Sequence, residues 1–447
     1  MFDRDGAGAT LAQCCRLKEK VTDPFLLKHP ECIRFTGFQN VTINLPQAAF
    51  KGKTLQGTLK EISKAMDLAM KAHQQKKVYT QTLLDTDGSP LRSLGLPSDD
   101  GTPYVNLNKA TYIMGLIGLN EVVQYLTGKE LHEGKDAYET GLLIIDHMYQ
   151  KINQLKLETG LKVTLEETPA ESATQKLAKG DMARFPEAKK VIKGDIKKAP
   201  YYTNSIHLNP GANVSILDRI ELQSKFHDMI ESGSIIHVYC GESQIPPASI
   251  GTLVEKTFRN TRASQITVSP EFTHCNNCHT NYFGFKDKCG KCESTDMTKR
   301  TKIVGYFSNL SGWNDSQLEI SRAREAVAPN YSNFAPGLNW LHEADTSKKV
   351  MVFGKPGCAM CEEAKASLTL ALKEKGIEIP VEFHDLSTPE GRLEAARWNV
   401  PLDPIPTVLV KNNGSAVRHE LEFKRGKPVH RKEVEYFKMV EGAYAVK

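Results

Sequence analysis

Four cysteines in two closely spaced pairs constrain this chain more than any other feature of its sequence. The pairs are Cys275-Asn-Asn-Cys278 and Cys289-Gly-Lys-Cys292. Two thiolates from one Cys-x-x-Cys turn can bind the same ion, and a second pair completes a tetrahedral sulfur site. Because four sulfurs leave no open position for a substrate, the pattern predicts a structural Zn²⁺ that holds the backbone of residues 272–295. Redox cysteines and an iron–sulfur cluster are the alternatives.

A turn-rich segment follows the second pair. It reads Lys302-Ile-Val-Gly305-Tyr306 and continues through Ser308 to Trp313, which predicts a loop over residues 300–315. On the simplest interpretation, Gly305 supplies a positive φ in a turn.

Adjacent cysteines lie near the start of the sequence. Cys14 and Cys15 stand directly before Arg16, within the segment 8–20. A disulfide between neighbours would twist the peptide that joins them, so we expect separate roles for the two thiols. The alternative is a pair of buried packing thiols.

A strand is predicted where β-branched and aromatic residues run from Cys32 to Leu45 and end at Pro46. Side chains alternate along a strand, which here separates a polar face from an apolar face. The polar face comprises Cys32, Thr36, Asn40 and Asn44, and the apolar face comprises Ile33, Phe35, Val41, Ile43 and Leu45. Such a strand is suited to line a polar active site, in which Asn40 and Asn44 would contact the substrate.

These motifs together resemble the anaerobic, class III ribonucleotide reductases. In that family a cysteine-bound zinc precedes an Arg-Val-x-Gly-Tyr segment, for which this chain has Lys302-Ile-Val-Gly305-Tyr306, a departure at two positions. The resemblance implies that residues 1–335 form the C-terminal half of a ten-stranded α/β glycyl-radical barrel with a finger loop at 8–20. It also implies a glycyl radical at Gly305 and a thiyl radical at Cys15, preferred to Cys14 because the family places arginine after the thiyl cysteine.

The same resemblance suggests two further site residues and a reaction. Met297 would lie beside the substrate, unless it merely fills a loop, and Cys32 would belong to an active-site dithiol, unless it is structural. A separate activase that uses S-adenosylmethionine and an iron–sulfur cluster would remove hydrogen from Gly305. The enzyme would then reduce ribonucleotides, expected to be triphosphates, to the deoxyribonucleotides needed for DNA replication.

Alternating helical and strand patterns support the α/β class. Helices are predicted over 54–75, 112–126, 142–155, 172–179 and 216–230, and strands over 162–166, 202–208 and 234–240. His237 and Cys240 fall in the last of these strands, where we expect satisfied core positions rather than catalytic ones.

The composition changes after Pro329. A linker is predicted over 336–347, and residues 348–447 follow as a second domain. Its strand at 349–353 leads into Gly357-Cys358-Ala-Met-Cys361 and a helix, and strands at 381–385 and 405–410 follow. A Cys-x-x-Cys at a strand-to-helix turn resembles the thioredoxin fold and the glutaredoxin-like hydrogen donors, in which Pro406 would be the cis-proline that faces the cysteines. Zinc binding is the alternative for Cys358 and Cys361.

A redoxin on the same chain indicates where the electrons come from. Tethering raises the effective concentration of Cys358, which is useful only if a disulfide in the reductase must be reduced by thiol exchange. We therefore expect Cys358 and Cys361 to deliver the electrons, with an external thiol reductant such as a thioredoxin reductase behind them. No Gly-Gly motif for glutathione follows Val410.

Length and charge exclude some classes of function. The chain has 447 residues, and its 58 basic and 53 acidic side chains leave a net charge of +5, too small to indicate binding to nucleic acid or to a membrane. No apolar run reaches the roughly 20 residues of a membrane span, so we expect a cytoplasmic protein.

The resemblance covers only half of a reductase barrel, which would expose strand edges. We therefore expect a split enzyme that needs an N-terminal partner chain and forms a homo- or hetero-oligomer. Two alternatives remain: an inactive half-barrel that acts only as a protein disulfide reductase, and a glycyl-radical enzyme of another class.

Overall fold

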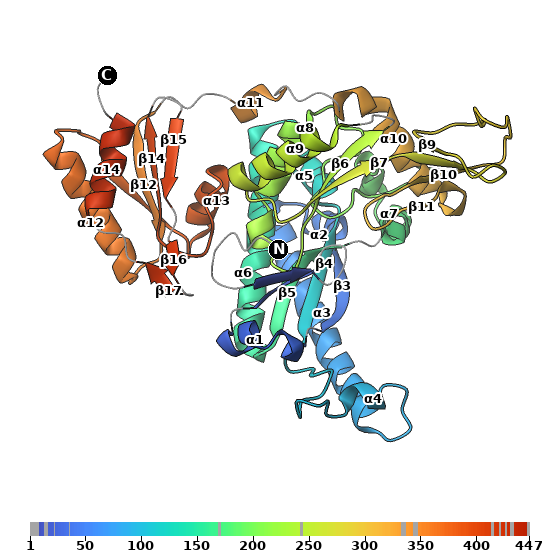
Figure 1. The fold of residues 1–447 in the computed structure, drawn as a ribbon, viewed down its shortest axis with the longest axis horizontal. Helices are drawn as coiled ribbons and strands as arrows, with labels where there is room; N and C mark the ends of the chain where they lie inside the picture. Colours follow the sequence, from blue (N-terminus) through green and yellow to red (C-terminus); the bar gives the residue numbers. More distant parts are fainter. Residues whose placement is uncertain are drawn as a thin grey trace. The chain divides into compact units, whose positions relative to one another are not determined.

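The computed structural model describes residues 9–12, 17–21, 23–34, 36–168, 171–241, 245–331, 337–342, 347–412, 415–419, 422–424, 427–429 and 433–444 (Figure 1). The chain divides into two compact units. The larger comprises Ala12–Glu19 and Arg34–Leu341, and the smaller comprises Met1–Leu11, Lys20–Ile33 and His342–Lys447.

Parallel strands form the centre of the larger unit. Strands β3 (Gly37–Asn44), β4 (Thr111–Ile117) and β5 (Lys162–Glu167) lie parallel in that order, and β6 (Ile236–Gly241) pairs in parallel with β7 (Ile266–Pro270). A parallel bridge joins Glu166 to Gly233, just before β6, and the Glu167 amide donates to the Gly233 carbonyl at 2.9 Å. The strands therefore follow one another in the order β3-β4-β5-β6-β7.

Helices connect and cover these strands, as a parallel sheet requires. They are α2 (Leu45–Gly52), α3 (Leu55–Asp85), α5 (Leu119–Thr127), α6 (Lys135–Thr159), α7 (Glu171–Arg184), α8 (Ile216–Ser224), α9 (Pro247–Asn260) and α10 (Asp315–Tyr331). Local chemistry fixes where the first two begin, because the Asn44 and Thr54 side chains accept hydrogen bonds from the Gln47 and Gly57 amides. None of the helices in the described ranges combines the length and apolar character of a membrane span.

Short elements account for further described residues of both units. They are β1 (Ala9–Ala12), β2 (Lys18–Val21), α1 (Pro24–Lys28), η1 (Pro30–Cys32), α4 (Arg92–Gly95), η2 (Pro186–Lys190), η3 (His227–Met229), η4 (Leu310–Gly312) and α11 (Asn339–His342). Strands β1 and β2 pair with each other. Cys14 and Cys15 lie between them, outside the described residues.

Three predictions from the sequence were wrong. Residues 112–126 were expected as one helix, but β4 occupies 111–117 and α5 begins only after Gly118. Every residue of β4 is buried. A continuous apolar segment shows no hydrophobic periodicity, so the sequence could not distinguish a central strand from a helix here. The sharp change occurs at Gly118, whose φ of 84° suits glycine.

The second error concerns residues 202–208, which do not form a strand: Asn204 makes an isolated bridge to Ile117, and Tyr201, just before this range, makes another to Lys193. The third concerns Cys32, which lies in η1 and not on the polar face of β3. Strand β3 begins at Gly37, and a register shift at Gln39, with a φ of 53°, precedes Asn40.

A separate antiparallel sheet extends from the parallel strands. It has the order β11-β10-β8-β9 and consists of β8 (Phe272–Cys275), β9 (Asn281–Phe283), β10 (Met297–Thr301) and β11 (Ser308–Asn309). This sheet carries the four clustered cysteines, and we call it the cysteine ribbon.

The smaller unit contains a four-stranded sheet in the order β13-β12-β14-β15. Its elements are β12 (Lys349–Gly354), α12 (Ala359–Glu374), β13 (Val381–Asp385), α13 (Pro389–Arg397), β14 (Thr407–Asn412), β15 (Ser415–His419), β16 (Glu422–Lys424), β17 (Lys427–Val429) and α14 (Glu433–Tyr444). Strand β12 is parallel to β13 and antiparallel to β14. Alternate residues of β12 pack on opposite faces: Val350 and Val352 contact α12 and α14, whereas Met351 and Phe353 contact α13.

Candidate active site

The four cysteines of the ribbon form one cluster of sulfur atoms. All four Sγ atoms lie within 4.8 Å of one another, and the shorter separations are 3.6 Å for Cys275 with Cys292 and 3.5 Å for Cys278 with Cys289. A tetrahedral zinc with Zn–S bonds of about 2.3 Å needs sulfur atoms roughly 3.8 Å apart. The donor set and its spacing therefore fit Zn²⁺, which would have a structural function here.

Neighbouring groups favour the thiolate form of Cys289. The Tyr282 hydroxyl lies 3.1 Å from the Cys289 Sγ, and the amides of Lys291 and Cys292 each donate to this sulfur at 3.4 Å. The Tyr282 hydrogen bond is the main reason that the pKa of Cys289 falls to about 5. Thiolate is the form of cysteine that binds metal.

The ribbon leads directly into the loop that contains Gly305. Strand β10 pairs with β8 on one edge, where Met297 lies opposite Cys275, and with β11 on the other edge, where Thr301 lies opposite Ser308. Residues 302–307 thus form the loop closed by the Thr301–Ser308 pair. Strand β10, which leads into the Gly305 loop, is therefore bonded to the strand that contains Cys275. Met297 is the first residue of β10 and so belongs to the cysteine ribbon.

Nothing in the backbone or the packing requires a glycine at position 305. Gly305 does not have a positive φ. A Cβ atom built on it would meet only the Glu171 Oε1 atom within 4 Å, at 3.5 Å, which is an ordinary contact. The interpretation of Gly305 as a positive-φ turn residue is therefore wrong. Gly305 is half-buried, whereas the next residue, Tyr306, is 70% exposed.

Side chains from the parallel-strand region hold the backbone of this loop. The Tyr239 hydroxyl donates to the Ile303 carbonyl, and the Arg324 guanidinium donates to the Lys302 carbonyl at 2.9 Å. Arg324 also lies over the Tyr239 ring, 4.0 Å from its centroid. On the other side of the chain, the amides of Val304 and Gly305 donate to Glu171.

A small cavity of about 40 Å³ lies behind Ile303 and Val304. His207 and His237 line it, and both are buried. The fully buried Glu167, at the end of β5, lies 3.5 Å from His207 and 3.7 Å from His227. The prediction that His237 is a core residue agrees with this burial. Cys240 is half-buried, and burial raises the pKa of its thiol to about 11, so it is an unreactive thiol.

Asn40 and Asn44 each bind a carboxylate of the same unit. Asn40 donates to Glu166 at 2.7 Å. Asn44 donates to Asp181 at 2.8 Å, while its oxygen caps α2. The Tyr202 hydroxyl also donates to Asp181, at 3.0 Å. Both asparagines thus lie at the polar face of β3, as the alternation predicted, and Asn44 also has a structural role.

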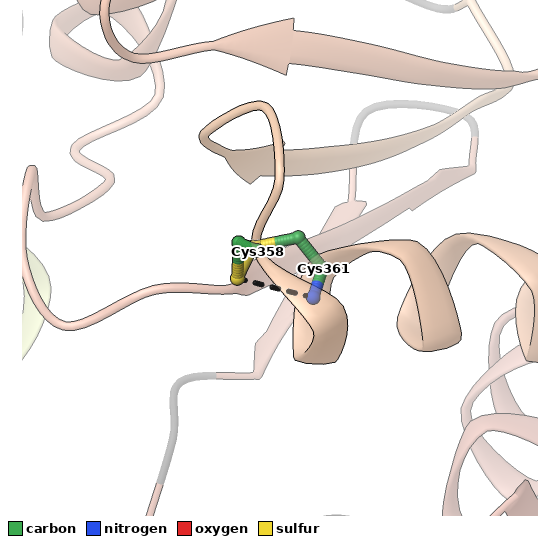
Figure 2. The surroundings of a disulfide bond; sticks show 2 residues. All are labelled: Cys358 and Cys361. Carbon is green, nitrogen blue, oxygen red and sulfur yellow. Dashed lines mark hydrogen bonds between the residues drawn. A yellow bond between two sulfur atoms is a disulfide. The ribbon is translucent and has the colours of Figure 1, made fainter.

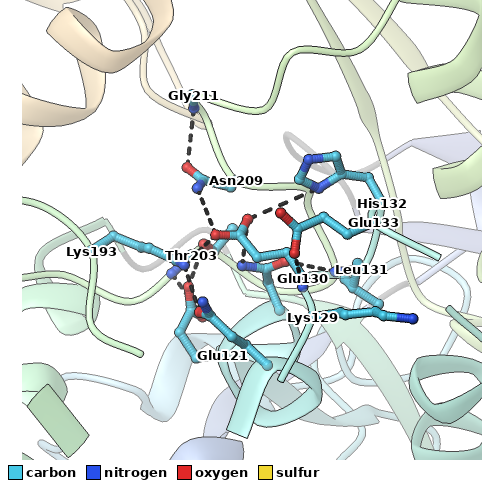
Figure 3. A network of polar contacts seen from close by, with 12 residues as sticks. Glu121, Lys129, Glu130, Leu131, His132, Glu133, Lys193, Thr203, Asn209 and Gly211 are labelled. Carbon is cyan, nitrogen blue, oxygen red and sulfur yellow. Dashed lines mark hydrogen bonds and ion pairs between the residues drawn. The ribbon is translucent and has the colours of Figure 1, made fainter. Parts of the chain in front are cut away.

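A second polar network lies beyond the carboxyl end of β4 (Figure 3). Glu121 is fully buried and accepts hydrogen bonds from the Thr203 amide at 3.1 Å and the Thr203 hydroxyl at 2.6 Å. Lys193 pairs with Glu130 nearby, and Asn209 also donates to Glu130, at 3.2 Å. Burial raises the pKa of Glu121. The network joins three segments of the chain: residues 121–130, Lys193 and residues 203–209.

The two cysteines of the smaller unit are joined by a disulfide (Figure 2). Cys358 is the N-cap of α12, and its sulfur accepts from the Cys361 amide at 3.3 Å. Cys361 is buried and Cys358 is half-buried. The Ile405–Pro406 peptide, directly before β14, is cis.

Several residues of this site carried no signal in the sequence. Glu171, Tyr239 and Arg324 come from three different elements, and only the fold brings them to residues 302–305. The polar run Glu166-Glu167-Thr168 at the end of an apolar strand was the one usable indication, because side chains at the carboxyl ends of parallel strands often line sites.

Comparison with known proteins relates this geometry to a family. The family described as anaerobic ribonucleoside-triphosphate reductase matches residues 2–325. Two curated relatives bear that name: the protein of Escherichia coli K12 is 27% identical over 286 residues, and that of Haemophilus influenzae is 23% identical over 286 residues. Each alignment covers 60% of this chain and 39% of the relative. The chain thus spans about two fifths of the length of these relatives.

A solved structure has a similar fold over about two thirds of this chain. The anaerobic ribonucleotide reductase from Thermotoga maritima in complex with dATP and CTP aligns with a TM-score of 0.50 at 19% identity. The alignment covers 66% of this chain and 45% of that structure. The family match extends over more than half of the chain, through the parallel strands, the cysteine cluster and the Gly305 loop. This chain belongs to the anaerobic ribonucleoside-triphosphate reductase family.

Proposed function

We propose that this chain supplies the radical-bearing part of an anaerobic ribonucleoside-triphosphate reductase, with the radical at Gly305. The observation that carries this proposal is that neither φ nor packing demands a glycine there. What glycine offers at this position is an α-carbon without a side chain, flanked by an amide nitrogen and a carbonyl that stabilise an unpaired electron. A separate activase of the S-adenosylmethionine and iron–sulfur type would remove one hydrogen atom from this carbon.

The radical would then pass to a cysteine and from there to the substrate. Cys15, in preference to Cys14, would give a hydrogen atom to Gly305 and, as a thiyl radical, take the 3′ hydrogen of the ribonucleotide. The 2′ hydroxyl would leave as water. Two thiols would supply the two electrons and two protons for reduction at carbon 2′ and become a disulfide, after which the 3′ hydrogen returns and the thiyl is regenerated. Zn²⁺ on the ribbon cysteines would hold the loop and take no part in the chemistry.

Three features of the smaller unit support a redoxin function. Its strand order and directions fit the expected thioredoxin fold, Cys358 caps α12, and Pro406 has a cis peptide. In this proposal Cys358 attacks the reductase disulfide, and Cys361 then displaces the mixed disulfide, which leaves two reductase thiols and the Cys358–Cys361 disulfide. An external thiol reductant, such as a thioredoxin reductase, would reduce that disulfide.

The remaining part of the family's reductase must complete the enzyme, whether it lies in a partner chain or in the same polypeptide. In support, β3 pairs only with β4 among the described strands, which leaves one edge of the sheet open to further strands. Asn40 and Asn44 on β3 would then face the substrate, and Met297 and Cys32 remain further candidates for the site.

The test is anaerobic turnover of ribonucleoside triphosphates by the chain together with the complementary part of the reductase and the activase. We expect deoxyribonucleotide formation with a dithiol reductant, loss of turnover in Gly305→Ala, and strong loss in Cys358→Ser. Turnover with formate that persists in full in Cys358→Ser would contradict electron delivery by the smaller unit. Disulfide reduction through Cys358 without any turnover would favour the inactive half-barrel instead.

A further inference from the structure

We infer that Glu171 is a positioning residue for Gly305, and that its carboxylate sets both the place of the Gly305 α-carbon and the electron distribution of its peptide. The inference rests on the proposed radical at Gly305. Glu171 is the first residue of α7, and it is separated from Gly305 by 134 positions in the sequence. No motif in the sequence connects the two residues.

The contact is made by one oxygen to two successive amides. The Glu171 Oε1 atom accepts from the Val304 amide at 3.0 Å and from the Gly305 amide at 3.0 Å. The other oxygen, Oε2, accepts from the Gln317 side chain of α10, also at 3.0 Å. One carboxylate oxygen is therefore fixed by α10, while the other binds the loop.

The opposite groups of the loop backbone are held as well. Tyr239 on β6 binds the Ile303 carbonyl, and Arg324 on α10 binds the Lys302 carbonyl. Side chains from three elements thus bind the backbone of four consecutive residues, 302–305. These hydrogen bonds replace the backbone–backbone hydrogen bonds that a strand or helix would supply. Glu171 differs from the other two because it contacts the peptide group of Gly305 itself.

A carboxylate at this place has an electronic effect that a neutral acceptor lacks. Hydrogen bonds to an ionised acceptor are shorter and roughly twice as strong as neutral ones. When the Gly305 N–H is drawn towards a negative charge, its nitrogen becomes a better electron donor to the adjacent α-carbon. That carbon is electron-poor as a radical, so the carboxylate should stabilise the radical and change the share of unpaired spin on the nitrogen.

The geometry also gives the carboxylate a positional effect. Hydrogen bonds from the amides of the Ile303–Val304 and Val304–Gly305 peptides to one carboxylate oxygen fix the orientation of the peptide that precedes Gly305, and with it the direction of the Gly305 Cα–H bonds. Hydrogen transfer depends steeply on such alignment. Loss of Glu171 should therefore reduce radical transfer as well as radical stability.

The test compares Glu171→Gln and Glu171→Ala with the parent chain in the complete, activated enzyme. Glu325→Gln is the matched control, since it removes from α10 an exposed carboxylate that accepts a hydrogen bond from the Ser321 hydroxyl. Electron paramagnetic resonance gives the spin per chain, the α-proton coupling and the decay time. Amide hydrogen exchange of residues 302–307, measured without activation, reports on the hydrogen bonds between Glu171 and the loop backbone.

We expect Glu171→Ala to exchange these amides at least tenfold faster and to lower the spin per chain at least tenfold. Glu171→Gln should keep part of the protection of these amides, because its side-chain oxygen still accepts hydrogen bonds. It should alter the α-proton coupling and shorten the radical's decay time, because the acceptor is neutral. Glu325→Gln should match the parent in each readout.

Unchanged exchange in Glu171→Ala would overturn the inference, whether or not a radical forms. So would an unchanged coupling and decay time in both Glu171 variants. Absence of a radical in the parent chain, with the exchange effect present, would instead count against the proposed function and leave the hold on the loop established.

Discussion

Met297 on β10 lies directly opposite Cys275 on β8, so the strand that leads into Gly305 is bonded to the strand that begins the cysteine cluster. The far end of β10 pairs with β11 through Thr301 and Ser308, which closes the loop. A structural ion on the cysteines would thereby stabilise the base of the loop without touching Gly305. Metal binding and loop order are expected to be linked for this reason.

The first prediction concerns the metal. Cys289→Ser should reduce bound zinc, measured by elemental analysis, from about one ion per chain to a small fraction, because only three sulfur ligands remain. Removal of zinc with a chelator should increase proteolytic cleavage within residues 272–309. Cys32→Ser, a half-buried cysteine outside the cluster, serves as the control and should keep its zinc. A full zinc content in Cys289→Ser would contradict this assignment.

Tyr239→Phe tests how the loop is held. The change removes the donor to the Ile303 carbonyl and leaves that buried group without this partner, at a cost of about 1 kcal/mol in the free energy of unfolding. Hydrogen exchange in residues 302–307 should become faster. Tyr79→Phe is the control, since Tyr79 on α3 is 67% exposed. Equal exchange in both variants would show that the hydroxyl does not hold the loop.

Glu121 should make stability dependent on pH. Burial raises the pKa of this carboxyl in the folded state, so the folded protein binds the proton more tightly than the unfolded chain does. Its contribution to stability is therefore present in full below the ordinary glutamate pKa of about 4.3 and is lost as the pH rises through the folded value. Each unit of upward shift corresponds to about 1.4 kcal/mol.

Glu121→Gln should remove that dependence. Thermal midpoints from pH 5 to 8 should fall less steeply with pH in Glu121→Gln than in the parent. The exposed Glu325→Gln should follow the parent curve. A steeper fall in Glu121→Gln would show that the sign of the Glu121 effect is wrong.

The two cysteines of the smaller unit should be separable by function. Cys358 is half-buried at the start of α12, whereas Cys361 is buried, so Cys358 is the sulfur that another molecule can reach. Cys358→Ser should lose reduction of a small aromatic disulfide. Cys361→Ser should react once and retain a mixed disulfide, which mass spectrometry detects as a stable adduct. An adduct that is lost as fast as in the parent would argue against Cys361 as the resolving thiol.

The sequence predicted well the features that depend on residues close together in the chain, and predicted poorly those that depend on residues far apart. The cysteine pairs, the strand at 381–385 and the Cys358 turn follow from short patterns and agree with the structure. Buried strand β4 could not be told from a helix because both of its faces are apolar. Residues 202–208 look like a strand, yet only Asn204 among them forms a bridge, to Ile117.

The residues around Gly305 illustrate the same limit at the site. Gly305 could be selected from its local sequence, but the absence of a structural need for glycine there is visible only once φ and neighbours are known. Glu171, Tyr239 and Arg324 reach the loop through tertiary packing, and such contacts between distant elements carry no local pattern. Cys14 and Cys15 lie outside the described residues, so their roles stay predictions from the sequence.

The most direct test of the account is electron paramagnetic resonance of the anaerobically activated enzyme, with the chain labelled at glycine by deuterium on the α-carbon. The account predicts a doublet from the single remaining α-hydrogen of Gly305, its collapse to a singlet on labelling, and its absence in a Gly305→Ala variant that folds with an unchanged thermal midpoint. A radical that persists in Gly305→Ala, or a spectrum that labelling does not alter, would contradict the claim that Gly305 carries the radical.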